Sequence, residues 1–144
     1  MATHKQTARK FSSIGKLEIR TGLEGLTPAR IVTLYRRAPI LRPVSSAEAV
    51  WTMFERSSHV FTAWHEGELV GIARLISDGV LYTYLCDLAV EPDVQGLGVG
   101  RQLMKTVLEA CKGTDLVLRD SDLSAGFYER LGFKRVSNAW IKGR

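Results

Sequence analysis

The sequence predicts an α/β (α+β) fold in which a mixed, mostly antiparallel central sheet is flanked by helices. Two turn signals, "HEGE" and "SDG", separate β-branched and aromatic runs, which predicts three successive antiparallel strands near 59–65, 68–76 and 80–90. A helical pattern and another strand follow, and this order predicts one parallel pair joined by a crossover. The 144 residues, 45% of them hydrophobic, are enough for one domain with its own core.

The elements before these strands are marked by helix-start signals. The segment "KLEIRTG" predicts a short first strand. Thr27 followed by Pro28 predicts a helix over 28–37, because threonine caps a helix and proline is tolerated at its first position. Ser45 and Glu48 have the spacing of a capping box, so a second helix is expected from there.

The second half continues with alternating helices and strands. A helix begins near Gly98 and stops at Gly113, and "DLVLRD" predicts a short buried strand. The segment "DLSAGFYERLGF" predicts a helix that ends at Gly132, and "FKRVSNAWIKG" closes the chain with strand-like segments. We expect Trp51, Trp64 and Trp140 in the core.

The net charge of +5 is concentrated at the N-terminus, where the first sixteen residues contain no acid and hold four basic ones, Lys5, Arg9, Lys10 and Lys16. We therefore expect a flexible basic tail over 1–16 and one folded domain over 17–144. A nucleic-acid partner is not expected, because a binding domain keeps its basic stripe on the folded body. The segment "KQTARK" of the tail resembles part of a core-histone tail.

The apolar runs and the cysteines indicate in which cellular compartment the protein is expected. The longest apolar runs are shorter than the roughly 18 to 20 residues of a membrane span, and no signal-peptide core is evident. Cys86 and Cys111 lack a metal-like or disulfide-like spacing, which favours a reducing compartment. We expect no membrane partner, no metal and a cytoplasmic protein, with a nuclear or organellar location left open.

Three glycines, Gly96, Gly98 and Gly100, lie between an apolar strand and a helix. Backbone N–H groups at a helix start attract anions, and glycine lets the backbone approach a phosphate closely. A nucleoside triphosphate loop would continue with Lys and Ser or Thr, whereas Arg101 and Gln102 follow here. The dinucleotide fingerprint would need glycine at 101. A glycine-rich turn without a ligand is the remaining alternative.

The pattern that does match is Q/R-x-x-G-x-G/A, carried by Gln95, Gly98 and Gly100. The stretch 85–104 resembles the acetyl-coenzyme A motif of the GNAT superfamily of N-acetyltransferases, and "SAGFYERLGFKRV" resembles the second signature of that family. The resemblance extends over about residues 17–142. It implies a sheet whose fourth and fifth strands splay apart around the cofactor.

The function implied by the resemblance is transfer of the acetyl group of acetyl-CoA to a primary amine. The acceptor would be a small-molecule amine, a protein lysine or a protein N-terminus, attacking directly in a ternary complex. The alternative is a catalytically silent acyl-CoA-binding sensor or interaction module. The presence of Tyr128, which a sensor could lose, favours the enzyme.

The resemblance also implies which residues bind acetyl-CoA. They lie on the fourth strand, the glycine loop and the two following helices: Leu88, Ala89, Val90, Gln95, Gly96, Leu97, Gly98, Val99, Gly100, Arg101, Ser121, Ser124 and Tyr128. The strand backbone would pair with the pantetheine arm, and the loop amides would hold the pyrophosphate. Ser121 stands where relatives often have asparagine, which changes the expected binding geometry.

Tyr128 matches the family position of the general acid, and Asp87 is the candidate base. Strand alternation, however, puts Asp87 on the opposite face from Tyr84, Cys86 and Leu88. Tyr84 and Asp120 are therefore rival bases, and a hydrogen-bonded Asp87 without a catalytic part is the alternative. A Cys86 acyl carrier is less favoured than a buried strand cysteine.

The acceptor itself is not specified by the sequence. Four arginines, with no acid between residues 25 and 47, make the first helix and its loop basic: Arg30, Arg36, Arg37 and Arg42. By the resemblance this region borders the acceptor site, so a basic rim weakly favours an acceptor that is not a polycation. A homodimer is compatible with the sequence.

Overall fold

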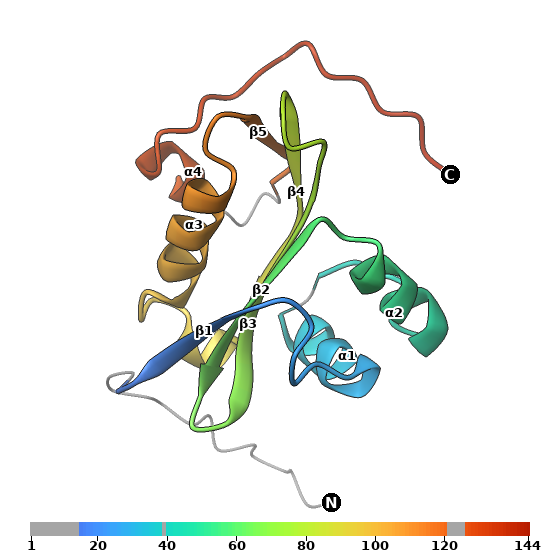
Figure 1. Ribbon diagram of the computed structural model, residues 1–144, viewed down its shortest axis with the longest axis vertical. Helices are drawn as coiled ribbons and strands as arrows, with labels where there is room; N and C mark the ends of the chain where they lie inside the picture. The colour runs from blue at the N-terminus through green and yellow to red at the C-terminus, as the bar shows by residue number, and fades with distance from the viewer. Residues whose placement is uncertain (1–14, 39, 121–125) are drawn as a thin grey trace, which may run out of the picture.

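A five-stranded sheet forms the centre of the computed structural model, which describes residues 15–38, 40–120 and 126–144 (Figure 1). Its strands, in spatial as well as chain order, are β1 (Leu17–Thr21), β2 (His59–His65), β3 (Glu68–Ser77), β4 (Tyr82–Val90) and β5 (Asp115–Leu118). The first four are antiparallel neighbours, and β5 is parallel to β4. The predicted mixed, mostly antiparallel sheet is confirmed.

Helices cover both faces of this sheet (Figure 1). They are α1 (Pro28–Arg37), α2 (Ala47–Glu55), α3 (Val99–Ala110) and α4 (Phe127–Arg130), with a 3-10 turn, η1 (Pro92–Val94), before α3. The Thr27 hydroxyl accepts a hydrogen bond from the Arg30 N–H, as the capping prediction requires. The cap of α2 is Ser46, one residue later than Ser45, because the Ser46 hydroxyl accepts from the Ala49 N–H.

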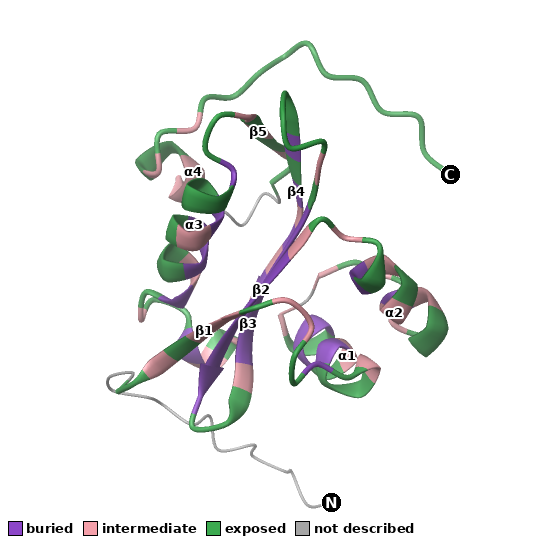
Figure 2. Cartoon of the chain, in the orientation of Figure 1, coloured by how far each residue is buried: buried purple, intermediate pink, exposed green. Residues whose placement is uncertain are grey.

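The core consists of two layers, one on each face of the sheet (Figure 2). Members of the α3 layer include Ala73, Leu75, Leu85, Val99, Leu103, Met104 and Val107. Members of the α1–α2 layer include Ile31, Tyr35, Val50, Phe54, Trp64 and Ile72. Gly71 permits the close approach of α3, since a Cβ there would lie 2.8 Å from the Leu103 Cδ1. Both helix layers therefore fix the orientation of β3 and β4 between them.

A β-bulge interrupts β4 in the middle. Arg74 pairs with Asp87, whereas the next residue of β3 pairs with Leu85, so Cys86 is an extra residue on β4. The extra residue shifts the alternation by one and places Asp87 on the same face as Tyr84. The expectation that these two side chains lie on opposite faces is wrong, because strict alternation does not hold across a bulge.

The C-terminal part differs most from the sequence prediction. No strand follows α4 among the described residues, and Trp140 is 98% exposed rather than in the core. The predicted closing strands are therefore wrong, because this segment leaves α4 as an extended chain that pairs with none of the described strands (Figure 1). β5 is half exposed instead of buried, since it is the edge strand of the sheet.

Some expectations concern residues that the structure does not describe. The first fourteen residues of the predicted tail are outside the described ranges, as are residues 121–125 at the start of the last predicted helix. Within the described ranges, no helix combines the length and the apolar character that crossing a bilayer demands.

Candidate functional site

The site begins where β4 and β5 part. β5 pairs with β4 from Tyr82 to Leu85 and no further, so the rest of β4, Cys86 to Val90, has β3 on one side and no described strand on the other. This confirms the splayed fourth and fifth strands. The Gln95 Nε2 donates to the Val90 carbonyl oxygen at 3.2 Å, which closes the loop at the end of this open edge. The open edge offers backbone groups to an extended ligand.

The glycine loop lies at the end of the open edge. Gly98 is the N-cap of α3 with a φ of +88°, and no side chain caps the helix there. Gly96 has a φ of +84°, and a Cβ at either glycine would meet nothing within 4 Å. The first N–H groups of a helix have no acceptor inside the helix. The loop therefore combines hydrogen-bond donors, a positive helix end and open space, which suits a phosphate group.

The other loop residues have different surroundings. A Cβ at Gly100 would lie 3.6 Å from both the Phe127 Cζ and the Val90 Cγ2, so this glycine allows α3 to pack closely against α4 and β4. Val99 is 1% exposed in the core, whereas Arg101 is exposed. The side chain of Val99 is therefore structural.

Tyr128 lies on α4 between two aromatic rings. Its ring meets those of Phe127 and Phe133 edge-on, at centroid distances of 5.1 and 5.6 Å. It packs against the α3 layer, as do Leu88 and Val90 of the open edge. Burial raises the pKa of the Tyr128 phenol, and the negative charge of Asp120 raises it further. The hydroxyl is therefore protonated at neutral pH and can donate a proton or a hydrogen bond.

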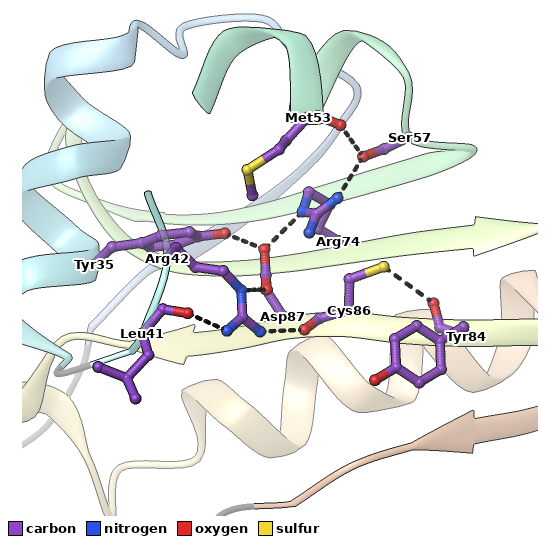
Figure 3. A network of polar contacts seen from close by, with 9 residues as sticks. All are labelled: Tyr35, Leu41, Arg42, Met53, Ser57, Arg74, Tyr84, Cys86 and Asp87. Atoms are coloured by element: carbon purple, nitrogen blue, oxygen red, sulfur yellow. Dashed lines mark hydrogen bonds and ion pairs between the residues drawn. The ribbon is translucent and has the colours of Figure 1, made fainter. Parts of the chain in front are cut away.

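Asp87 is at the centre of a buried polar network, drawn in Figure 3. Its side chain is fully buried, and the carboxylate accepts hydrogen bonds from the Tyr35 hydroxyl at 2.8 Å, from the Arg74 Nε at 2.6 Å and from the Arg42 Nε. Burial raises the pKa of Tyr35 well above its ordinary value, with the charge of Asp87 adding to the effect. Burial alone would lower the pKa of Arg74, but the hydrogen bond to Asp87 and the negative charge of Asp87, with smaller contributions from Cys86 and Tyr35, together raise it.

This network changes the interpretation of Asp87. Two guanidinium groups and a phenol occupy the carboxylate, so little capacity is left to accept a proton from an amine. Arg42 also donates to the Cys86 carbonyl oxygen at 2.6 Å, which attaches the loop after α1 to the bulge of β4 (Figure 3). Sequence reasoning missed the roles of Tyr35 and Arg74. The sequence offered one signal for this network: Arg74 is an arginine inside the otherwise apolar strand β3, and a buried arginine needs an acidic partner.

Tertiary ion pairs also neutralise much of the basic rim. Arg37 lies 2.7 Å from a Glu91 carboxylate oxygen and 3.1 Å from the Asp93 carboxylate, and Arg42 is paired with Asp87. Burial raises the pKa of Glu91, whereas Arg37 opposes this shift. The rim is therefore much less positive than the sequence suggests, because its partner acids come from distant segments of the chain.

The remaining candidates occupy varied positions. Tyr84 is 38% exposed on the same face as Asp87, and Asp120 is ion-paired with Arg135 at 3.0 Å. Cys86 is half-buried, and burial raises its pKa, so the thiol is protonated and a poor nucleophile. Ser121 and Ser124 lie outside the described residues. Elsewhere in the chain as described, no group of three or more His, Cys, Asp or Glu side chains is placed to hold a metal ion.

Comparison with known proteins points to one family. Residues 38–142 match the family described as the acetyltransferase (GNAT) domain. The chain is 34% identical over 105 residues to serotonin N-acetyltransferase 2, chloroplastic, of Oryza sativa subsp. japonica, covering 71% of this chain and 49% of the rice protein. The chain spans about half the length of the curated relatives it matches.

Solved structures show the same fold. A GNAT-family acetyltransferase from Streptococcus pneumoniae TIGR4 superposes with a TM-score of 0.71 at 23% identity, over 90% of this chain and all of that one (100%). The PaiA N-acetyltransferase of Thermoplasma acidophilum, solved in complex with coenzyme A, superposes with a TM-score of 0.64 at 19% identity, over 83% of this chain and 91% of that one.

Proposed function

Because the chain belongs to the GNAT acetyltransferase family, we propose that it transfers the acetyl group of acetyl-CoA to a primary amine, by direct attack in a ternary complex. The observation that carries this proposal is the open edge of β4, which leads from the bulge at Cys86 to the glycine loop before α3. An extended thiol arm fits such an edge, and a diphosphate fits such a loop.

The residues present suit acetyl-CoA. The backbone of Leu88 to Val90 would pair with the pantetheine arm, and the amides of Gly96 and of Gly98 to Arg101 would hold the pyrophosphate in the open space beside the two left-handed glycines. Acetyl-CoA supplies an activated acetyl thioester when bound. The Val90 N–H, at the end of the open edge, is our proposed donor to the thioester carbonyl.

We assign Tyr128 the role of proton donor to the departing thiolate. Its ring is held by the aromatic pair against the α3 layer, on which Leu88 and Val90 of the open edge also pack, and its raised pKa keeps the proton available at neutral pH. When the phenol O–H bond breaks, a thiol S–H bond forms; the nitrogen loses one N–H proton as the C–S bond breaks and the amide forms, and that proton, carried by water, restores the phenol.

Asp87 acts in this proposal as a positioning residue. It fixes Arg42 and thereby holds the α1–α2 loop against the bulge, next to the open edge. The proton of the attacking ammonium leaves to water before attack, since the buried carboxylate is already occupied by three donors. In this scheme no side chain of the protein has to accept the proton of the ammonium group.

The acceptor proposal draws on the rice relative, whose name identifies a serotonin N-acetyltransferase. An arylalkylamine is therefore the first acceptor to test. A polyamine and a lysine-containing peptide complete the comparison, because the ion-paired rim does not repel cations as strongly as the sequence suggests.

The experiment measures the thiol released from acetyl-CoA in the presence of each amine, together with the thermal midpoint with and without acetyl-CoA. We expect thiol release with at least one amine. At a hundredfold excess of ligand over its dissociation constant, binding should stabilise the fold by about 2.7 kcal/mol. An unchanged midpoint would contradict acetyl-CoA binding. A raised midpoint without release for any amine would instead indicate the silent binding module.

A further inference from the structure

The loop between β4 and α3 carries two acids directly before its glycines. Glu91 and Asp93 precede Gly96 in the chain, and their side chains are only 12% and 22% exposed. A diphosphate bound at the glycines would share this loop with two negative charges, and like charges repel one another most where little water screens them. An anion site in such a loop therefore requires a positive charge that neutralises the two carboxylates.

The backbone that carries the two acids is fixed against the sheet. The Glu91 N–H donates to the Val70 carbonyl oxygen of β3 at 2.8 Å, and Val94, at the end of η1, is fully buried in the core. The Val94 N–H donates to the Glu91 carbonyl oxygen at 3.0 Å, and the Leu97 N–H donates to the Val94 carbonyl oxygen at 3.2 Å. The acids and the glycines are thus held in one hydrogen-bonded loop, so the loop does not carry the acids away when a ligand binds.

Arg37, at the end of α1, supplies the compensating charge. Its Nη2 donates a hydrogen bond to the Asp93 Oδ2 at 3.1 Å and lies 2.7 Å from the Glu91 Oε1. Among the described residues, no hydrogen bond reaches that buried Glu91 oxygen, so its contact with the guanidinium is electrostatic. Burial raises the pKa of Glu91, Arg37 opposes this shift and Asp93 adds to it. One arginine therefore compensates two acids that come from a distant segment of the chain.

Arg37 acts at one end of the open edge only. Arg42, which follows it in the chain, donates to the Cys86 carbonyl oxygen at 2.6 Å and so attaches to the bulge at the other end (Figure 3). Loss of Arg37 leaves that attachment in place. Its effects should therefore be confined to the glycine loop and to the part of a ligand that binds there.

We infer that Arg37 is a positioning residue for acetyl-CoA: it neutralises Glu91 and Asp93 and thereby allows the glycine loop to bind a diphosphate. The inference rests on the proposed function, because it assumes that the diphosphate binds at this loop. Arg37 acts through the two acids and not by contact with the ligand. Its loss should therefore weaken binding only while both acids are present.

The first test compares two neighbouring arginines. Arg36 is also in the last turn of α1, but it is exposed and has no ion pair among the described residues. Calorimetry of acetyl-CoA at about 0.1 M salt should show a Kd raised about three- to tenfold in Arg37→Gln. Arg36→Gln removes the same charge and should change the Kd by less than about twofold. At about 1 M salt, where the Debye length falls from about 10 to about 3 Å, the two variants should converge.

A double variant separates charge compensation from direct contact with the ligand. Arg37→Gln with Asp93→Asn removes the cation together with one of the acids, and it should recover most of the affinity that Arg37→Gln loses. Asp93→Asn alone should not weaken binding. If Arg37 touched the phosphates, or if its loss unfolded the loop, the double variant would bind as weakly as Arg37→Gln or more weakly, and the inference would be overturned.

Steady-state kinetics provide a second readout with any amine that supports thiol release. Arg37→Gln should raise the KM of acetyl-CoA and leave kcat unchanged, because Arg42 still holds the bulge. Acetyl-CoA that fails to bind the wild-type chain would overturn the proposed function and this inference with it. Wild-type binding that Arg37→Gln leaves unchanged, or that Arg36→Gln weakens equally, would overturn this inference alone.

Discussion

At the scale of single residues, burial assigns different roles to similar side chains. Burial raises the pKa of both Tyr35 and Tyr128, but their surroundings differ. The Tyr35 hydroxyl is committed to the Asp87 carboxylate, whereas Tyr128 is held by aromatic rings beside the open edge of β4. Only the second arrangement is compatible with the proposed role of the hydroxyl as a proton donor.

Replacement of Tyr128 by phenylalanine tests this assignment. Tyr128→Phe should lower kcat by about tenfold to a thousandfold, the contribution of a general acid, with little change in the Kd of acetyl-CoA. Steady-state kinetics and calorimetry measure the two quantities. Tyr82→Phe is the control, because Tyr82 is 54% exposed at the far end of β4. Equal kcat values for the two variants would contradict the role of Tyr128.

Removal of the Asp87 charge should mainly affect stability. Asp87→Asn leaves Arg42 and Arg74 without their shared anion, so the free energy of unfolding should fall by about 3 kcal/mol. Asp93→Asn breaks an ion pair that is 22% exposed at the aspartate and should cost less than about 1 kcal/mol. Urea titrations compare the two variants.

The same variant distinguishes a positioning role from proton abstraction. The pH–rate profile of Asp87→Asn should keep the acidic limb of the wild-type profile at a lower plateau, because water removes the proton from the amine. Loss of that limb would show that Asp87 is the base.

At the scale of elements, two local irregularities create the site. The bulge at Cys86 reorients the second half of β4, and the left-handed glycines let the chain turn from β4 into α3 with its amides exposed. Neither feature belongs to a regular strand or helix. Both lie at the ends of the same five-residue open edge, so they mark the two ends of the proposed binding site.

Gly98→Ala tests the loop against a matched glycine. Gly98 and Gly22 have nearly the same φ, +88° and +89°, and a Cβ meets nothing within 4 Å at either position. Each alanine should therefore cost a similar backbone strain of about 1 kcal/mol. Only Gly98→Ala should weaken acetyl-CoA binding, since its Cβ enters the space proposed for the pyrophosphate. Equal affinities in the two variants, measured by calorimetry, would place the phosphates elsewhere.

At the scale of the whole molecule, the fold keeps several acidic groups protonated. Burial raises the pKa values of Cys86 and Cys111 above the ordinary 9.0, and those of Tyr35 and Tyr128 above the ordinary 10.0. The unfolded chain therefore releases these protons at lower pH than the folded chain does. The associated stability is complete below the unfolded pKa values and is lost as the pH rises through the folded ones.

The free energy of unfolding should accordingly fall as the pH rises above about 9, by up to about 1.4 kcal/mol per pH unit for each group. Urea unfolding between pH 7.5 and about 10 measures this slope. Cys86→Ala removes one contributing group and should flatten the first part of the decline. A stability that is constant or rises over this range would contradict the effect of burial.

Sequence alone determined the elements whose signals are local. Thr27 and Pro28 predicted the start of α1, the turn signals predicted β2 to β4, and the glycine pattern predicted both the loop before α3 and the family. These signals work because capping, turn formation and the glycine conformation depend on a few neighbouring residues.

Tertiary structure decided what depends on distant partners. The network around Asp87 joins Tyr35, Arg42 and Arg74 from three separate segments, and no local pattern encodes that meeting. The bulge follows from the register between two strands, which places Asp87 on the face of Tyr84 against strict alternation. The exposed C-terminal segment with Trp140 has a strand-like sequence but pairs with none of the described strands, because a strand forms only where a partner edge supplies its hydrogen bonds.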